Sequence, residues 1–466
     1  MNSLLWFRND LRIDDNPALH HFLNQPSSMN SRKAIFFVSE KQWQAHDWSP
    51  MKVDFIKRHA ADLVNVLSQY NITLSLIDVP DFASQIDYLL QYCSDNNIDN
   101  VMANSEVEFN EQQRDKACVK VGINLTLFEA DVIVPKGKVL NQSGKMYKVF
   151  TPFKRAWLKH VKACGFDYLG KPLCEQNPSY IEESPSTLSN DLERGISQHW
   201  PLGKNFTQSK LPCFYQDKLT DYAAHRDIPS IKGTSGISPY LAAGLISPRY
   251  VLTTLIAKSP DILLAIDSAE FTWLNELIWR EFYRHLMFHE QRLCKNECFN
   301  TKYQHVTWLN DQVLFKAWCE GKTGYPLVDA AMRQLNQTGW MHNRLRMVVA
   351  SFLTKHLLID WRLGEKYFMQ HLIDGDLASN NGGWQWAAST GCDAQPYFRV
   401  FNPIRQSERF DPNGTFIRKY IPELEVIPDK KIHFPHQYIK DNNLPIYWSA
   451  IVDHKEARLQ ALSFYK

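Results

Sequence analysis

Short apolar runs alternate with helical patterns over the first 135 residues of the chain. Runs of this length, rich in branched and aromatic side chains, are typical of buried β-strands. Five of them are predicted as strands: Leu4–Arg8, Ala34–Val38, Leu74–Val79, Asn100–Ala103 and Leu125–Val134. Strands that alternate with helices form a parallel sheet covered on both faces. The pattern therefore predicts an α/β domain with a doubly wound parallel sheet over residues 1–135.

Two helices are predicted between these strands, and the first of them has a clear start signal. Ser49-Pro50 joins a residue that caps helix N-termini to a proline suited to the first turn. Apolar side chains follow at spacings of three and four residues: Val53, Ile56, Ala60, Leu63, Val64 and Leu67. A second apolar face runs from Phe82 to Cys93. The first strand is followed by RNDLRIDDNPAL and no GxGxxG, so ordinary dinucleotide binding at that turn is not expected.

The rest of the chain divides into a connector and a helical domain. Residues 136–215 contain scattered prolines, among them Pro172, Pro178, Pro185, Pro201 and Pro212, and the polar stretch EESPSTLSNDLERG, and they are predicted as a long connector. From residue 216 to 466 the apolar periodicity is helical with few strand signals. No apolar run approaches the roughly 18 residues of a membrane span, so no membrane partner is expected. The start MNSLLWFRND lacks the pattern of a secretory signal.

Charge and cysteine usage add two weaker indications. The net charge of +2 conceals −7 over residues 1–135, from 11 basic and 18 acidic groups, and +9 over the remainder. The basic part is a weak indication of a polyanionic partner, and by itself it is better explained by a solvated surface. Nine scattered cysteines without a CxxC pair are typical of a reduced cytosolic chain. Nothing in the sequence indicates more than a monomer.

Tryptophans gather between residues 273 and 386, where polar residues are interleaved with them. In the helical pattern SAEFTWLNELIWREFYRHL, Trp273, Glu276, Arg280 and Arg284 fall within an arc of about 80°, with Trp279 beside them. Large aromatic residues alone are explained by core packing. Because charged residues share the stripe with two tryptophans, the wall of a cleft is favoured over a solvated face.

Three further segments combine side chains that suit ligand binding. TGWMHNRLRM places Asn343, Arg346 and Met347 on one helical face, and LIDGDLASNNGGWQW brings two aspartates, amides and tryptophans together. GTSGISPY at 233–240 suits an anion held by backbone N–H groups and hydroxyls, although a simple helix cap explains it as well. No His or Cys lies near the aspartates at ligand spacing, so a metal site is not predicted. The set suits a flat, phosphorylated, redox-active ligand better than a hydrolytic site.

With these residues in view, the chain resembles the photolyase/cryptochrome family, and most closely the bacterial class I photolyases that act on cyclobutane pyrimidine dimers. The similarity covers nearly the whole chain, and its most specific segments are WLNELIWREFYRHL, GKTGYPLVDAAMRQLNQTGWMHNRLRM and DGDLASNNGGWQWAASTGCDAQPYFRVFNP. The resemblance implies a lyase of the bacterial cytosol that binds dimer-containing DNA, double or single stranded. Excited reduced FAD would pass an electron to the flipped-out dimer, the ring would split and the electron would return.

The resemblance also implies a U-shaped FAD in the helical domain. The positions expected to line it are Tyr222, Thr234, Ser235, Gly236, Ile237, Ser238, Trp273, Glu276, Arg280, Trp340, Asn343, Arg346, Asp374, Gly375, Asp376 and Asn380. The Thr/Ser loop would grip the pyrophosphate, and Arg346 paired with Asp374 would lie along the flavin edge. Asn380 would face flavin N5, which favours the repair branch over cryptochromes. Gly236-Ile237 departs from the family's commoner Arg-Leu.

For the substrate, the resemblance assigns Glu276 to hydrogen-bond the dimer and stabilise its radical anion. Asn343, Arg344 and Met347 would position the bases, Trp279 and Trp386 would form apolar walls, and Arg226 would hold phosphate. The branch that repairs (6-4) photoproducts usually has His at the positions of Asn343 and Met347, so cyclobutane dimers are the predicted substrate. A (6-4) photolyase, a cryptochrome-type photoreceptor and a flavin-dependent oxidoreductase are the alternatives.

Two further groups of residues follow from the resemblance. Trp384, Trp361 and Trp308 match an electron-transfer chain that photoreduces oxidised FAD; core packing is the alternative explanation for them. The antenna domain has contacts expected for 5,10-methenyltetrahydrofolate at His46, Asn110, Glu111, Cys294 and Lys295. A deazaflavin antenna and an empty antenna site are the alternatives to folate.

Overall fold

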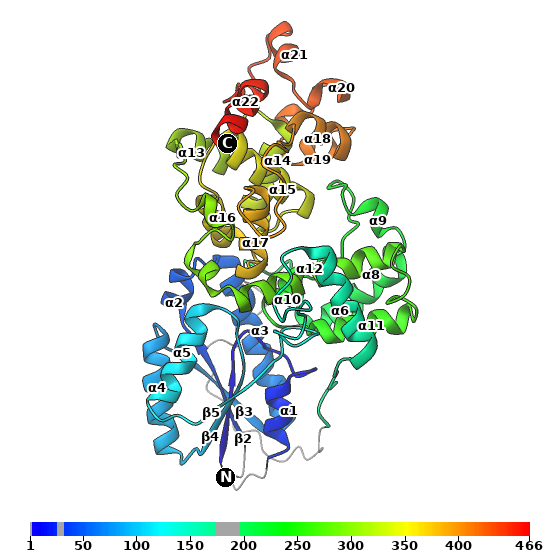
Figure 1. The fold of residues 1–466 in the computed structure, drawn as a ribbon. Helices are drawn as coiled ribbons and strands as arrows, with labels where there is room; N and C mark the ends of the chain where they lie inside the picture. The colour runs from blue at the N-terminus through cyan, green and yellow to red at the C-terminus, as the bar shows by residue number, and fades with distance from the viewer. Residues whose placement is uncertain (1, 26–31, 174–195) are drawn as a thin grey trace. The chain divides into compact units, whose positions relative to one another are not determined.

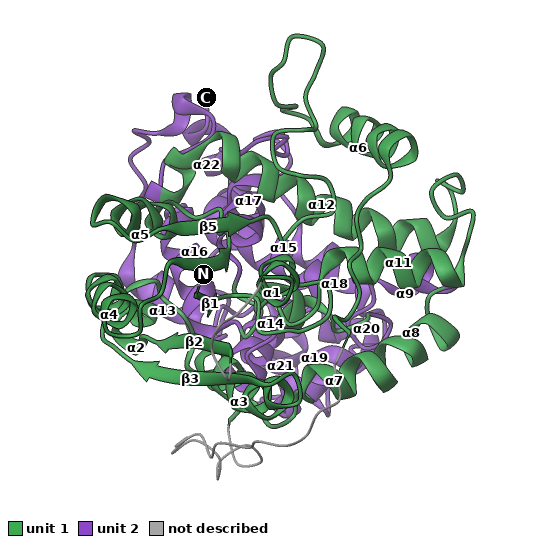
Figure 2. Ribbon diagram, turned by 90° about the horizontal axis from the view of Figure 1, so that it is seen from below, with its two compact units in different colours: residues 1–219, 235–294, 373–375 green, residues 220–234, 295–372, 376–466 purple. Residues whose placement is uncertain are grey.

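The computed structural model describes residues 2–25, 32–173 and 196–466, which form two compact units (Figures 1 and 2). The first unit comprises residues 1–219, 235–294 and 373–375, and the second comprises residues 220–234, 295–372 and 376–466. Part of the predicted connector, residues 174–195 with EESPSTLSNDLERG, lies outside the described residues. No helix in the described ranges is long and apolar enough to cross a membrane.

The first unit is built on a five-stranded parallel sheet, as predicted, and its strands lie in the order β3-β2-β1-β4-β5. The strands are β1 (Ser3–Phe7), β2 (Arg32–Val38), β3 (Ile72–Asp78), β4 (Asn100–Asn104) and β5 (Leu125–Phe128). β1 pairs with β2 on one side, Leu5 opposite Ala34, and with β4 on the other, Leu5 opposite Met102. The chain therefore changes winding direction at β1, which makes a crevice at the carboxyl ends of β1 and β4 the expected ligand site of such a sheet.

Helices cover both faces of the sheet and continue into a helical part of the same unit. α4 and α5 lie on one face, and α1 and α3 lie on the other (Figure 1). The helices of this unit are α1 (Pro17–Leu23), α2 (Glu40–Ala45), α3 (Pro50–Ser68), α4 (Phe82–Asp95), α5 (Phe109–Lys120), α6 (Phe150–Cys164), α7 (Gly203–Asn205), η1 (Phe206–Lys210), α8 (Leu211–Asp217), α10 (Ser238–Ala242), α11 (Pro248–Lys258) and α12 (Ala269–His289), with η2 (Gln291–Lys295) at the boundary. Ser49 caps α3 by accepting the Lys52 amide, and Pro50 opens the helix, as predicted.

The predicted strand Leu125–Val134 is too long, because β5 ends at Phe128. Beyond that residue the backbone donors turn to a side chain instead of a neighbouring strand. The buried carboxylate of Glu281, on α12, accepts the amides of Ile133 and Val134 at 2.8 and 3.1 Å. Ile133 and Val134 are therefore held by a side chain about 150 residues away, which the apolar run could not reveal.

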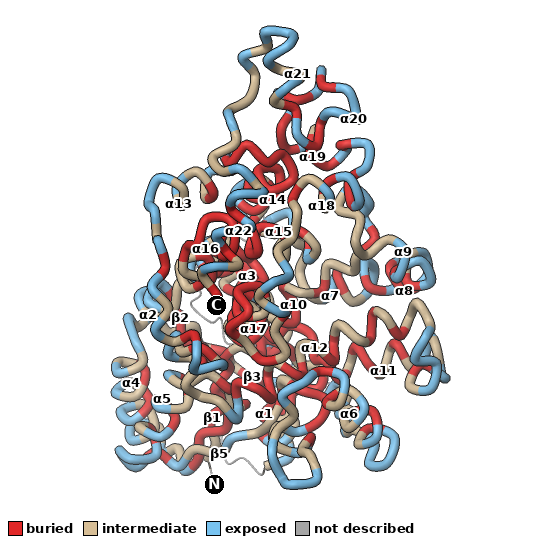
Figure 3. Tube along the Cα trace, turned by 45° about the horizontal axis from the view of Figure 1, so that its top comes forward, coloured by how far each residue is buried: buried red, intermediate tan, exposed pale blue. Residues whose placement is uncertain are grey.

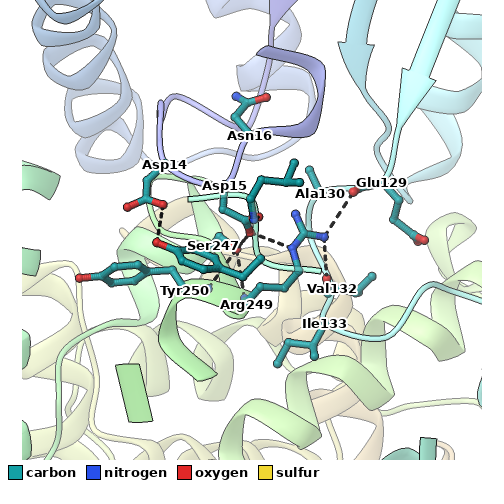
Figure 4. A network of polar contacts seen from close by, with 12 residues as sticks. Asp14, Asp15, Asn16, Glu129, Ala130, Val132, Ile133, Ser247, Arg249 and Tyr250 are labelled. Carbon is teal, nitrogen blue, oxygen red and sulfur yellow. Dashed lines mark hydrogen bonds and ion pairs between the residues drawn. The ribbon is translucent and has the colours of Figure 1, made fainter. Parts of the chain in front are cut away.

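The turn after β1 holds the sheet to the helical part of the same unit (Figure 4). The Arg249 side chain on α11 donates to Asp15 at 2.7 Å and to the carbonyl of Val132 at 3.3 Å. Arg12 donates to the carbonyl of Gly244 at 2.9 Å. The segment that lacks a dinucleotide-binding glycine motif is thus used for buried polar contacts.

The segment predicted as a connector contains regular structure that packs in the first unit. α6 lies within residues 136–215 and contacts α12, and η1 and α8 follow it. The boundaries 1–135, 136–215 and 216–466 stay a prediction. The two compact units interleave along the sequence, since residues 220–234 belong to the second unit and 235–294 to the first.

The second unit is helical, which confirms the expected fold class. Its elements are α9 (Tyr222–His225), η3 (Thr301–Tyr303), α13 (Gln312–Cys319), α14 (Pro326–Thr338), α15 (Asn343–Ser351), η4 (Phe352–His356), α16 (Trp361–His371), α17 (Leu377–Ala387), α18 (Pro403–Phe410), α19 (Thr415–Tyr420), η5 (Pro422–Leu424), α20 (Asp429–Ile432), α21 (His436–Asp441) and α22 (His454–Phe464). The buried trace, red in Figure 3, runs along α14 and α17, and their side chains share one apolar core.

Candidate functional site

α12 carries the stripe of aromatic and charged residues that the sequence predicted. Ser268 caps this helix of 21 residues. Trp273 is buried, its indole N–H lies 3.4 Å from Ser235 Oγ, and Glu276 is half-buried. Arg280 donates to the carbonyl of Asp131 at 2.6 Å. Three predicted flavin positions thus lie along one helix of the first unit, and Trp273 joins them to the Thr/Ser loop.

The Thr/Ser loop brings further predicted residues together in the first unit. Ser238 Oγ donates to Asp374 at 2.6 Å, so the loop is linked to the aspartate predicted beside the flavin. Gly236 has φ +66°, a conformation that glycine adopts without strain. Lys52, which the sequence analysis did not single out, donates to the carbonyl of Gly375 at 2.7 Å.

The start of α17 lies in the second unit and orients two predicted flavin contacts. Asp376 caps the helix by accepting the Ser379 amide at 2.8 Å. Asn380 donates from its side-chain nitrogen to the carbonyl of Glu365 at 2.9 Å. In this assignment of the amide, the Asn380 side-chain oxygen remains as an acceptor. Glu365, which the sequence analysis missed, also accepts from Asn381 at 3.0 Å.

At the start of α15, a charged pair gathers residues predicted to hold DNA. Arg344 binds Asp227 through two hydrogen bonds, at 2.7 and 3.2 Å. Its guanidinium carbon lies 4.5 Å from the centroid of the Phe410 ring, and one of its nitrogens is 3.9 Å from Met347 Sδ. Asn343, the first residue of α15, is exposed. The sequence analysis singled out neither Asp227 nor Phe410, because each comes from a segment far along the chain.

Two buried nitrogen atoms near the start of α15 have no hydrogen-bond partner in the described part of the chain. The indole N–H of Trp340 is buried without a hydrogen-bond partner among the described residues, and so is Nε2 of His342. The two rings lie 6.4 Å apart, edge to face. Arg346 donates to the carbonyl of Met341 at 2.8 Å. Buried donors without acceptors are rare in folded proteins, so they fit the acceptor atoms of a bound flavin nucleotide.

The remaining residues predicted to contact flavin or DNA belong partly to the first unit and partly to the second. Tyr222 is buried, and the Arg226 guanidinium carbon lies 5.5 Å from its ring centroid. Thr234 belongs to the second unit, whereas Ser235 follows in the first. Arg346 and Asp374 also fall in different units, so their pairing stays a prediction.

The three tryptophans predicted for electron transfer lie in the core of the second unit. Trp361 and Trp384 are almost fully buried, and Trp308 is 8% exposed. Trp318, another fully buried tryptophan, contacts the Trp384 ring with 6.0 Å between the ring centroids. Trp386 is half-buried. Burial in one core fits both electron hopping and packing, so the electron-transfer role stays a prediction.

A substitution at Gly364, on α16, can test whether the position of the Trp384 indole matters. A Cβ at this residue meets Trp384 Cη2 at 2.2 Å and Leu353 Cδ2 at 2.6 Å. We expect Gly364→Ala to displace the indole and to lower the free energy of unfolding by about 1–3 kcal/mol through overpacking. Flavin photoreduction should slow with it. Gly383→Ala is the control, because a Cβ at Gly383 meets no atom within 4 Å. The rate of flavin photoreduction under illumination and the free energy of unfolding in urea are measured for both variants. Equal values for the two variants would contradict the close contact of Gly364 with Trp384.

Four of the five predicted antenna residues lie in the first unit, and three of them form one cluster. His46 Nδ1 is 3.3 Å from Glu111 Oε1, and the Asn110 amide is 3.1 Å from His46 Nε2. Burial acts to raise the pKa of Glu111, but the hydrogen bond and charge of His46 outweigh it and hold that pKa below its usual range. Burial raises the pKa of the Cys294 thiol to about 12. Lys295 belongs to the second unit.

The crevice at the carboxyl end of the sheet is largely filled by the protein's own side chains. Trp43 and Trp48 stack with centroids 5.2 Å apart, and Arg8 lies 3.9 Å from the centroid of the Trp6 ring. Arg114 bridges to Glu106 at 2.8 Å. The cavity left among these residues has a volume of about 40 Å³. His46 and Glu111 are among the residues that line this cavity, so it adjoins the predicted antenna cluster.

Comparison with known proteins identifies the family. The description "DNA photolyase" matches residues 3–177, and "FAD binding domain of DNA photolyase" matches residues 273–466. The deoxyribodipyrimidine photo-lyase of Escherichia coli K12 is 44% identical over 99% of this chain and 98% of its own. The crystal structure of a bacterial class III photolyase from Agrobacterium tumefaciens has a TM-score of 0.82 at 34% identity, covering 100% and 97% of the two chains. A Synechocystis cryptochrome structure has a TM-score of 0.83 at 27% identity, covering 99% of each chain.

The fold and the site thus define a two-part flavoprotein with a sheet domain and a helical FAD-binding part. The chain belongs to the DNA photolyase family.

Proposed function

We propose that this protein is a light-dependent lyase that repairs cyclobutane pyrimidine dimers in DNA. The observation that carries the proposal is the 44% identity, over almost the full length of both chains, to a relative named deoxyribodipyrimidine photo-lyase. Bound FAD would supply the light-driven electron that splits the ring. The chain itself has to hold the cofactor, to receive the dimer and to orient the groups beside the reacting bonds.

For the cofactor, the supporting contacts are the Ser238–Asp374 hydrogen bond and the orphaned Trp340 N–H. Because the Asn380 side-chain nitrogen donates a hydrogen bond to the carbonyl of Glu365, we propose that the Asn380 side-chain oxygen accepts a hydrogen bond from N5–H of the flavin. An acceptor held there favours flavin states that carry that proton. Cys or Asp at residue 380 would be expected to change which reduced state persists after illumination.

For the substrate, we propose that Glu276 hydrogen-bonds the dimer and that Asn343 and Met347 contact its bases. Neither residue 343 nor 347 is His, which supports cyclobutane dimers over (6-4) photoproducts. Trp279 and Trp386 are proposed as the apolar walls for the flipped-out bases. Arg226 and Arg344 are proposed phosphate contacts, so binding should weaken as salt rises.

For the antenna, we propose a folate held at His46, Asn110, Glu111, Cys294 and Lys295. The cluster of His46, Asn110 and Glu111 supports it, since these groups offer polar contacts to a pterin. An absorption band of the purified protein beyond those of the flavin, lost on denaturation and filtration with a folate in the filtrate, would support the folate.

Illumination of the reduced protein with damaged oligonucleotides tests the proposed reaction. We expect restoration of cyclobutane dimers in light, none in darkness, and no restoration of (6-4) products. Repair of (6-4) products alone would contradict the proposal, and flavin photochemistry without repair would favour a photoreceptor. Single-stranded oligonucleotides test whether strand pairing is needed, and sedimentation tests the proposed monomer. Fractionation of the source cell tests the proposed place in the bacterial cytosol.

The tryptophan chain gives a separate expectation. Trp308→Phe should slow photoreduction of oxidised flavin about tenfold or more, because phenylalanine is much harder to oxidise than tryptophan. Repair by pre-reduced protein should stay close to that of the parent. Transient absorption measures the first rate and the repair assay the second; an unchanged photoreduction rate would remove Trp308 from the path.

A further inference from the structure

Phe150 forms a parallel stack with Trp279 in the first unit. Their ring centroids are 3.6 Å apart and the planes differ by 5°. Phe150 is the first residue of α6, and Trp279 lies in the middle of α12. The sequence analysis assigns no role to Phe150, which falls in the segment predicted as a connector.

Other aromatic rings hold the same indole. Phe282 meets Trp279 edge-on at 5.8 Å, and Tyr283 lies tilted at 5.7 Å. Phe150 itself is 5% exposed and is backed by Phe282 at 5.9 Å. Phe150 therefore covers one indole face, while Trp279 remains half-buried and keeps part of its surface accessible.

We infer that Phe150 is a positioning residue for substrate, which holds the Trp279 indole in the orientation that receives a flipped-out base. This inference rests on the proposed function, in which Trp279 is a wall of the dimer site. Stacking of a base on an aromatic side chain contributes strongly to binding of unpaired nucleotides. A side chain that is already ordered loses little freedom on binding, so the stack raises affinity without touching the substrate. Undamaged duplex, whose bases stay in the helix, does not use this wall.

Phe150→Leu tests the inference, because leucine keeps the buried apolar group but has no flat face. We expect affinity for a dimer-containing duplex to fall about three- to tenfold, as for one side chain that must be ordered on binding. Affinity for undamaged duplex and the splitting rate at saturating substrate should stay unchanged. Phe150→Tyr, which restores the ring, should return dimer affinity to within about twofold of the parent.

Phe153→Leu is the matched control. Phe153 lies one turn further along α6, is equally buried, and packs edge-on against Phe282 and His285. It should leave the preference for dimer DNA unchanged, although both leucine variants lose core packing. Near-UV circular dichroism checks that each variant is folded and reports the indole environment.

A Trp279→Leu background separates positioning from general packing. There, Phe150→Leu should have no further effect on dimer affinity, and an undiminished effect would overturn the inference even if Phe150→Leu folds poorly on its own. If the parent prefers dimer DNA and Phe150→Leu keeps that preference, the inference fails while the proposed function stands. If the parent shows no preference for dimers, the proposed function itself fails.

Discussion

Asp329→Ala is expected to lower the free energy of unfolding by at least about 3 kcal/mol, because it orphans several buried donors at once. Asp329 is fully buried on α14. Its Oδ1 accepts the amide and the hydroxyl of Thr323 at 2.7 and 2.6 Å. Its Oδ2 accepts the Gly324 amide at 3.0 Å and the Trp448 indole N–H at 2.9 Å, and the Tyr447 hydroxyl donates to the same oxygen.

The carboxylate therefore holds a C-terminal segment against the loop before α14. The amide of Ile451 donates to the carbonyl of Thr323 at 3.0 Å. A Cβ at Gly324, where φ is +80°, meets Ala450 Cα at 2.4 Å, so the two backbones are in direct contact. Loss of Asp329 should release both sides, because alanine leaves the donors buried without water to replace the acceptor.

Asp453→Ala is the control for the Asp329 experiment. Asp453 also accepts two amides, from Lys455 and Glu456, as the cap of α22, and these contacts are exposed. Removal of such a cap usually lowers the free energy of unfolding by about 1 kcal/mol. Urea unfolding of both variants with the same flavin content compares them. Equal losses would show that the buried donors of Asp329 find other partners.

Local signals explain what could be predicted of the fold. Ser49 and Pro50 act within one helical turn, and the apolar runs of the sheet are continuous because both faces are covered. The end of β5 at Phe128 could not be predicted, because the apolar run continues to Val134, where Glu281 of another helix accepts the amides of Ile133 and Val134. The apolar run continues past the strand because residues beyond Phe128, such as Val132 and Ile133, are buried without belonging to the sheet.

The candidate site, too, contains residues that local sequence patterns could predict and residues that they could not. Trp273 and Glu276 could be predicted to lie together from the sequence, because the period of one helix places them on the same face. Asp227, Glu365 and Phe150 were missed because each acts on a predicted residue from a distant segment. The sequence indicates which side chains bear the chemistry, whereas the groups that orient them appear only when distant segments are packed.

Lys355→Met is expected to raise the free energy of unfolding at pH 7, the opposite of what most core substitutions do. Lys355 is fully buried in η4, and its ammonium nitrogen donates to the carbonyl of Arg399 at 3.0 Å. Burial, with a smaller contribution from the charge of Arg399, lowers the pKa of Lys355 to about 7. Methionine has a similar length and fills the site without a charge.

The pH dependence gives the sharper test of the Lys355 variant. Because the folded pKa lies below the ordinary value of 10.5, the unfolded chain binds a proton between pH 7 and 10.5 that the folded chain lacks. The parent is therefore destabilised most at and below pH 7, and it gains stability as pH rises. Relative to Lys355→Met, the parent should gain about 2 kcal/mol between pH 7 and pH 9.

At pH 7 the variant should exceed the parent by on the order of 3 kcal/mol, after allowance for the unpaired Arg399 carbonyl. Groups common to both proteins, such as the buried His356 beside Lys355, cancel in the difference between them. Lys316→Met, at an exposed lysine of α13, should show no such pH-dependent difference. If the stability difference between parent and Lys355→Met is the same at pH 7 and pH 9, Lys355 does not change its protonation on folding in that range, and its burial is compensated in the folded state.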